Sequence, residues 1–153
     1  MWNGNGANTR CAWPVPTLRL VLDTCVLVLA TLPAPRNKAA FIWELCRRNL
    51  FQVYVSPDTL AEYQRVLFAY PRFLLEIQAV AQICYPLFSV KAVRHEPDNR
   101  FLEVALAAEA DYLITVNTAP GHFDRKRYES VRVVTPGEFL QEPRVSARLR
   151  ELD

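Results

Sequence analysis

Four polar side chains stand where the sequence changes between apolar runs and helical patterns. Asp23 ends one apolar run, Asn117 follows another, and Glu62 and Asp98 lie early in helical segments. In open α/β sheets ligands gather at the carboxyl ends of the strands, so we expect these side chains at one end of one sheet. Oxygen ligands without a histidine or cysteine partner suit Mg²⁺ or Mn²⁺ better than zinc. The pattern therefore favours a site for a hard divalent cation.

Each of these residues also has an ordinary structural interpretation. Asp23 and Asp98 are of the residue type that caps helix N-termini. A single glutamate such as Glu62 is usually solvated on a helix, and Asn117 alone carries little information. The hypothesis of a site depends on all four side chains meeting in space, which only a structure tests.

The elements that must position these residues follow from periodicity. β-Branched and aromatic runs predict strands over residues 18–22, 51–55, 85–90, 111–116 and 131–134. Apolar spacing predicts helices over residues 37–49, 73–83, 99–109 and 136–140, and a further helix capped by Ser56 and Pro57. The apolar stretch 18–32 is expected to be a core strand that runs into a helix. Strands that alternate with helices indicate a single α/β domain, with three α/β/α layers and a mostly parallel sheet.

Length and composition fit one globular domain. The chain has 153 residues, 51% of them hydrophobic and 22% charged. Residues 1–17 show no periodicity and are expected to be a loose N-terminal extension, residues 18–142 the domain, and residues 143–153 a C-terminal tail. With only 4 glycines the chain has no glycine-rich phosphate loop. The net charge of +2 is too small to indicate a nucleic-acid partner by itself.

The cysteines and the longest apolar stretch bear on location. Cys11, Cys25, Cys46 and Cys84 form no CxxC pair, which favours reduced thiols and a cytoplasmic protein. The stretch 18–32 is too short to cross a bilayer, is interrupted by Asp23, and lacks a convincing cleavage site. We therefore expect neither a signal peptide nor a membrane partner.

Four segments resemble the motifs of PIN-domain nucleases. The run VLDTCVLV over residues 21–28 is similar to the family's opening motif. Residues 98–115 are similar to a second family motif, which has FLE near its start, here residues 101–103, and AD before its last strand, here residues 110–111. The stretch from Ser56 to Tyr63 and the run VVTPGEFL over residues 133–140 resemble the middle and closing segments. The resemblance covers residues 18–142 in order. It implies an α/β PIN-like fold and a Mg²⁺- or Mn²⁺-dependent nuclease.

The resemblance assigns roles to individual residues. Asp23, Glu62 and Asp98 match the family's metal-binding acids, and Asn117 stands at the position of the fourth acid. These four residues are the expected catalytic set. A substrate strand would be held by polar and basic groups near this set, and the candidates are Thr24, Thr115, Arg36, Lys38, Arg125, Lys126 and Arg127.

The chain departs from the family pattern at several positions. Cys25 replaces an asparagine after the Asp-Thr pair, Val116 replaces a glycine, and Glu109 replaces a glycine that ends a helix. An asparagine at position 117 also occurs in relatives with an N-x-x-H-F motif, which Gly121-His122-Phe123 approaches. Because Cys25 stands in place of asparagine, we expect the site to lack a side-chain amide beside Asp23. We expect the side chain of Val116 to narrow the approach to the metal.

The resemblance implies a metal-dependent endoribonuclease that acts on RNA. Because bacterial domains of this family commonly act as toxins beside an antitoxin and dimerise, it also implies a toxin component with a cognate antitoxin and a homodimer. A catalytically degenerate PIN-like module that binds RNA or a partner is the alternative, favoured by Cys25, Val116 and Asn117. A haloacid-dehalogenase-like phosphatase needs a second acid two residues after Asp23, where Cys25 stands. A response-regulator receiver needs paired acids and a late lysine, which are not evident.

Overall fold

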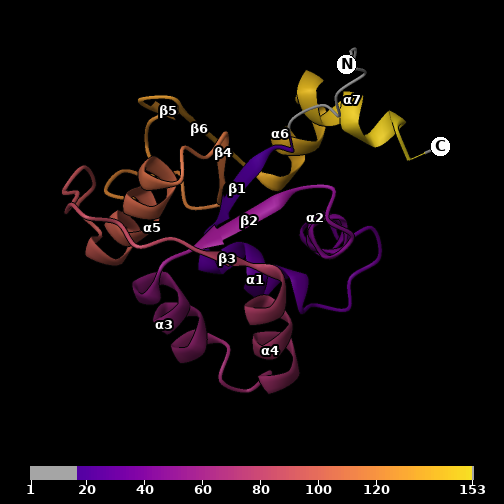
Figure 1. Ribbon diagram of the computed structural model, residues 1–153, viewed down its shortest axis with the longest axis horizontal. Helices are drawn as coiled ribbons and strands as arrows, with labels where there is room; N and C mark the ends of the chain where they lie inside the picture. The colour runs from indigo at the N-terminus through magenta and orange to yellow at the C-terminus, as the bar shows by residue number, and fades with distance from the viewer. Residues whose placement is uncertain (1–16, 153) are drawn as a thin grey trace, which may run out of the picture.

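A computed structural model describes residues 17–152 and shows one α/β domain around a six-stranded sheet with the order β3-β2-β1-β4-β6-β5 (Figure 1). The strands are β1 (Arg19–Leu22), β2 (Gln52–Val55), β3 (Gln82–Ile83), β4 (Tyr112–Ile114), β5 (Arg127–Tyr128) and β6 (Val131–Val134). The helices are α1 (Thr24–Ala30), α2 (Lys38–Arg47), α3 (Pro57–Val66), α4 (Pro71–Val80), α5 (Glu96–Ala107), α6 (Pro136–Gln141) and α7 (Pro143–Arg150). All neighbouring strands are parallel except β5 and β6.

The connections between parallel strands place helices on both faces of this sheet. The chain proceeds from β1 to β2 to β3 toward one edge, and then returns across the sheet to β4. Because such connections are right-handed, α2 and α5 lie on opposite faces. Helix α5 packs on β1, β2 and β4, whereas α2 packs on α6. In Figure 1, β1 and β2 run between α5 and α2. The prediction of an α/β domain with a mostly parallel sheet is confirmed.

Aromatic contacts join the helices to the sheet. The ring of Phe139 on α6 meets Phe51 and Tyr112 edge-to-face, at centroid distances of 5.2 and 5.4 Å. On another side of the domain, Tyr63 of α3 packs against Phe101 of α5 at 5.8 Å. All of these rings are buried, and each such pair adds about 0.5–1.5 kcal/mol beyond its burial. The packing fixes α3 and α5, which carry two of the candidate acids.

Most of the predicted elements are present. The strands near 18–22, 51–55, 111–116 and 131–134 appear as β1, β2, β4 and β6, each within two residues of the expected bounds. The predicted helix caps are also found: Ser56 caps α3 with Pro57 at its first position. Helix α5 begins at Glu96, so Asp98 lies in its first turn rather than ahead of it.

Two predictions around residue 83 were wrong. The helix expected over 73–83 ends at Val80, because Gln82 and Ile83 pair with β2 as strand β3. The strand expected over 85–90 does not form. Its end is held by α5 instead of a strand, since the Val90 amide donates to the Glu103 carboxylate at 2.9 Å. The amides of Ala92 and Val93 likewise donate to Asn99 at 3.0 Å.

The C-terminal segment is more ordered than a tail. Residues 143–150 form α7, and Val145 on this helix is fully buried. The expected N-terminal extension, including Cys11, lies almost entirely outside the described residues. None of the helices in the described part of the chain has the length and apolar character that crossing a membrane requires.

Candidate metal centre

Asp23 lies at the carboxyl edge of the sheet because β1 ends just before it. Its amide donates to the carbonyl of Ile114 at 2.9 Å, which joins the ends of β1 and β4. Asp23 is also the N-cap of α1, since its Oδ1 accepts from the Thr24 amide at 2.8 Å. The capping interpretation and the site interpretation therefore apply to the same residue.

The Asp23 carboxylate accepts hydrogen bonds from neutral groups. Its Oδ2 accepts from the Thr115 hydroxyl at 2.7 Å, the Cys25 thiol at 3.3 Å and the Asn117 amide at 3.5 Å. Among residues 17–152, no lysine, arginine or histidine forms an ion pair with Asp23, although only 3% of the residue is exposed. A buried carboxylate without a cationic partner is costly unless a cation binds it.

The charge of Asp23 is correspondingly hard to maintain. Burial raises the pKa of the Asp23 carboxyl above 3.8, and the nearby charge of Asp98 raises it further. The hydrogen bonds from Thr115, Cys25 and the Thr24 amide act in the opposite direction and lower it in part. Two carboxylates that repel each other in a buried place are an arrangement that a divalent cation would relieve.

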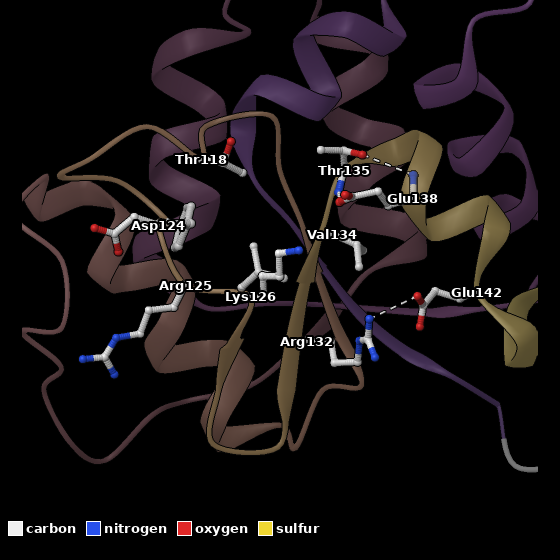
Figure 2. A pocket seen from close by; sticks show the side chains of 11 residues that line it. Thr118, Asp124, Arg125, Lys126, Arg132, Val134, Thr135, Glu138 and Glu142 are labelled. Carbon is white, nitrogen blue, oxygen red and sulfur yellow. Dashed lines mark hydrogen bonds and ion pairs between the residues drawn. The ribbon is translucent and has the colours of Figure 1, made fainter.

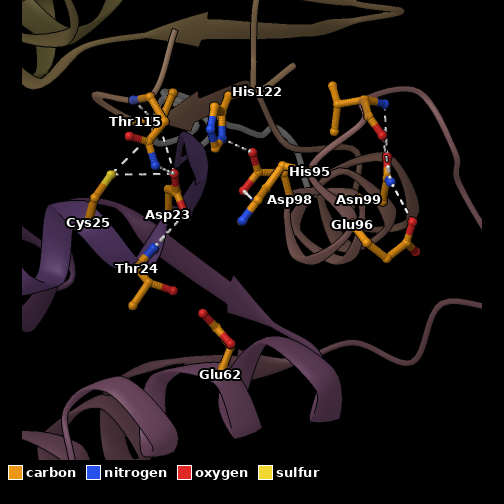
Figure 3. Close-up of polar contacts among 12 residues, drawn as sticks. Asp23, Thr24, Cys25, Glu62, His95, Glu96, Asp98, Asn99, Thr115 and His122 are labelled. Carbon is orange, nitrogen blue, oxygen red and sulfur yellow. Dashed lines mark hydrogen bonds and ion pairs between the residues drawn. The ribbon is translucent and has the colours of Figure 1, made fainter. Parts of the chain in front are cut away.

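Asp98 differs from Asp23 because two imidazoles contact it. His122 Nδ1 lies 2.8 Å from Asp98 Oδ2, and His95 Nδ1 lies 3.2 Å from Asp98 Oδ1. The two histidine rings are 4.6 Å apart between centroids. Figure 3 shows both rings at Asp98. Asp98 is buried, whereas the side chains of His95 and His122 are 49% and 32% exposed.

Glu62 approaches the same place from α3. Its carboxylate points up from the helix toward Thr24 in Figure 3. Arg65 holds both of its oxygens, at 3.2 Å and 2.9 Å. This ion pair is largely exposed and stabilises little, about 0–1 kcal/mol, so Glu62 is free to exchange it for another partner.

One cavity of about 230 Å³ connects these side chains. The four predicted catalytic residues all line it, and they come from the ends of β1 and β4 and from α3 and α5: Asp23, Glu62, Asp98 and Asn117. Thr24, Cys25 and His95 line it as well. The Thr24 hydroxyl is buried and has no hydrogen-bond partner within residues 17–152, so it is available to a ligand.

The three carboxylates line the same cavity, but their oxygens do not lie as close together as the ligands of one metal ion. Among the described residues, the group of three ligand side chains whose donor atoms lie within 4.8 Å of one another is His95, Asp98 and His122. Asp23 and Glu62 are not part of it. Mg²⁺ keeps several waters and needs one or two carboxylates, so its binding does not require all three acids to touch it directly.

The basic residues expected to hold substrate do not line this cavity. Arg36 and Lys38 lie beside Pro136 in a separate hollow. Arg125 and Lys126 line another groove, of about 360 Å³, which starts at Thr118 and continues to Arg132 (Figure 2). Arg127 is an exposed residue of β5. Thr24 and Thr115 do belong to the site, the first as a cavity residue and the second as a donor to Asp23.

The structure explains what the unusual residues do. The thiol of Cys25 donates to Asp23, so it takes over a hydrogen bond that the customary amide would supply. Burial and the charge of Asp23 raise the pKa of Cys25 to about 12, which keeps the thiol protonated and able to donate. Val116 is 43% exposed and does not line the cavity, so the expected narrowing is not observed. Glu109 has a φ of 53°, a conformation that favours glycine.

Comparison with known families agrees with this geometry. The sequence model of the PIN domain matches residues 19–119, a range that includes all four predicted catalytic residues. The chain belongs to the PIN-domain family. No curated protein and no solved structure matches the chain. The expected resemblance to PIN-domain proteins is confirmed.

Sequence reasoning missed His95, and it noted His122 only as part of a motif. His95 stands at the N-cap position of α5, three residues before Asp98, and its amide donates to the Gly121 carbonyl at 2.8 Å. That bond ties the start of α5 to the loop that carries His122. A histidine three residues ahead of a candidate ligand on a helix was the available signal, because residues three apart share a helix face.

Proposed function

We propose that the protein is a Mg²⁺- or Mn²⁺-dependent endoribonuclease that hydrolyses RNA phosphodiester bonds. Its PIN fold is generally that of nucleases, and the observation that carries the proposal is the cavity shared by Asp23, Glu62, Asp98 and Asn117. The carboxylate oxygens fit a hard cation, which would also offset the cost of the buried Asp23 charge, because residues 17–152 supply no cationic partner for it. Asp23 and Asp98 would hold this ion, with Glu62 as a further ligand.

Each residue has a distinct task in this proposal. The bound ion would supply charge stabilisation at the phosphate and make a water easier to deprotonate. Glu62, which is half-buried and paired with the exposed Arg65, is positioned to accept a proton from the attacking water. The free hydroxyl of Thr24 would donate to a phosphate oxygen, and Thr115 and Asn117 would orient Asp23.

Substrate contacts further from the cavity are part of the same proposal. Asn117 is followed by Thr118, where the groove of Figure 2 begins, and Lys126 points into that groove. Arginine and lysine side chains of this kind bind phosphates irrespective of sequence. We propose that an RNA strand passes from the cavity along Arg125 and Lys126, with Arg127, Arg36 and Lys38 as weaker contacts.

The biological role that we propose is a cytoplasmic toxin component inhibited by an antitoxin and acting as a homodimer. Free thiols at Cys25, Cys46 and Cys84 support a reducing location. Exposed apolar side chains on α4 and in the segments before and after it support a protein interface there, because such side chains seldom cluster at a solvated surface. These residues are Phe68, Tyr70, Leu75, Ile83, Tyr85, Leu87 and Phe88.

RNA cleavage by purified protein tests the activity. A mixed structured RNA is incubated with Mn²⁺ or with EDTA, using the wild type, Asp23→Asn and the control Glu44→Gln, whose exposed carboxylate lies on α2 outside the cavity. We expect cleavage that requires Mn²⁺ and survives only in the wild type and the control. Absence of cleavage by folded wild-type protein would favour the binding-module alternative.

A further inference from the structure

We propose that His95, Asp98 and His122 form a binding site for one transition-metal ion of the Zn²⁺ class, beside the carboxylate cavity. This inference rests on the proposed function only where it concerns the shared residue Asp98; the binding itself does not depend on nuclease activity. The site differs from the hard-cation site in its ligand chemistry, because two of its three donors are imidazole nitrogens.

The donor atoms are close enough to share an ion. One atom from each of the three residues lies within 4.8 Å of the others, and the two nitrogen-to-oxygen distances are 2.8 and 3.2 Å. Ligands at about 2.0–2.2 Å from a tetrahedral zinc are separated by roughly 3.4 Å. Small rotations of the half-exposed imidazole rings are sufficient to reach that spacing.

The backbone holds the two histidines in place before an ion arrives. The His95 amide donates to the Gly121 carbonyl at 2.8 Å, so the start of α5 is tied to the residue next to His122. Gly121 has a φ of 92°, and a side chain there would meet the Arg94 guanidinium at 3.1 Å. On the other side of His122, the ring of Phe123 is buried. The loop is thus anchored on both sides of the ligand.

The chemistry of the ligands selects the ion. Imidazole suits Zn²⁺, Co²⁺, Ni²⁺ and Cu²⁺, whereas Mg²⁺ prefers oxygen. Three protein ligands would leave room for water or another ligand on the ion. His95 and Asp98 also line the carboxylate cavity, so an ion held there would lie next to the place proposed for substrate. The chain contains only 2 histidines, and both are in this group. Any site that uses histidine must therefore use these residues.

The site has a consequence for the nuclease. Asp98 cannot serve both ions without sharing its two oxygens, and each oxygen already faces one histidine. An ion held by the histidines would draw the Asp98 carboxylate away from the hard-cation position. We therefore expect micromolar Zn²⁺ to reduce cleavage in millimolar Mg²⁺.

Cobalt absorption tests the binding directly. Co²⁺ is titrated into metal-free full-length protein and its visible absorption is followed for the wild type, His95→Gln and His122→Gln. The control is Cys84→Ser, because Cys84 does not line the carboxylate cavity. We expect one Co²⁺ per chain, displaced by Zn²⁺, with affinity lowered at least about tenfold by either histidine substitution and kept in Cys84→Ser. Circular dichroism establishes that each variant is folded.

Two results would overturn the proposal: wild-type protein that binds no Co²⁺, or folded histidine variants that bind it as the wild type does. Loss of binding in Cys84→Ser alone would assign the ion to that thiol and also overturn the proposal. The nuclease proposal fails separately, if wild-type protein binds Co²⁺ but cuts no RNA in Mg²⁺ or Mn²⁺ after Zn²⁺ has been removed.

Discussion

Replacing Asn117 by aspartate tests whether its surroundings form a cation site. Asn117 Nδ2 lies 3.5 Å from Asp23 Oδ2, so Asn117→Asp replaces a hydrogen-bond donor by a second negative charge at a similar distance. Two charges about 4 Å apart repel by about 4 kcal/mol at an effective dielectric constant of about 20. Because Asn117 is only half-buried, solvent screens part of this, and we expect a cost of about 2 kcal/mol without metal.

A divalent cation should reverse this cost. In EDTA the midpoint of thermal unfolding should fall by about 4–8 °C, given about 2–4 °C per kcal/mol for a chain of this size. With Mg²⁺ present the added carboxylate becomes a ligand. A tenfold gain in affinity would stabilise the variant by about 1.4 kcal/mol more than the wild type at saturating metal.

The measurement is thermal unfolding of the wild type, Asn117→Asp and Asn117→Ala, each in EDTA and in a Mg²⁺ series. Asn117→Ala loses the amide without gaining charge, so it separates the lost hydrogen bond from the repulsion. Equal unfolding midpoints for Asn117→Asp and Asn117→Ala in EDTA, or a Mg²⁺ response no larger in Asn117→Asp than in the wild type, would refute the electrostatic reasoning.

Three further predictions concern the acid, the thiol and one strained residue. Burial and the charge of Asp98 raise the pKa of Asp23, so the folded protein binds more protons than the unfolded chain between pH 3.8 and the raised pKa. The free energy of unfolding of the wild type in EDTA should therefore fall as the pH rises through this range. Urea titrations at several pH values should show no such fall for Asp23→Asn. Because the pKa of Cys25 is raised to about 12, iodoacetamide should alkylate the Cys25 thiol far more slowly at pH 8 than the Cys84 thiol. Peptide mass spectrometry measures the two alkylation rates, and equal rates would contradict this prediction. Glu109→Gly should raise stability by about 1 kcal/mol, since Glu109 has a φ of 53°, and an unchanged or lower unfolding midpoint would count against the strain.

The sequence predicted the parts of the site that local pattern controls. Asp23 was found because it ends an apolar strand, and α5 was found because its apolar residues recur at helical spacing. The parallel pairing of β1 with β4 then brought Thr115 and Asn117 to Asp23, as the strand-end argument required.

Features that depend on tertiary contacts were not predictable in the same way. The run 85–90 has strand-like composition, yet its last residue is held by the side chain of Glu103. His95 and His122 are 27 positions apart in the sequence and meet through the bond between His95 and Gly121. No periodic pattern encodes a contact between a helix start and a distant loop, so the histidine pair appeared only in the structure.

The central claim is that the buried acids bind the metal that cleavage requires. The most direct test measures Mn²⁺ binding by electron paramagnetic resonance and RNA cleavage in the same samples, for the wild type, Asp23→Asn and Glu44→Gln. We predict that Asp23→Asn loses Mn²⁺ affinity and at least about 100-fold in cleavage rate, equivalent to about 2.7 kcal/mol of lost charge stabilisation, while Glu44→Gln loses neither. Cleavage that persists in Asp23→Asn, or Mn²⁺ binding unaffected by that substitution, would contradict the account.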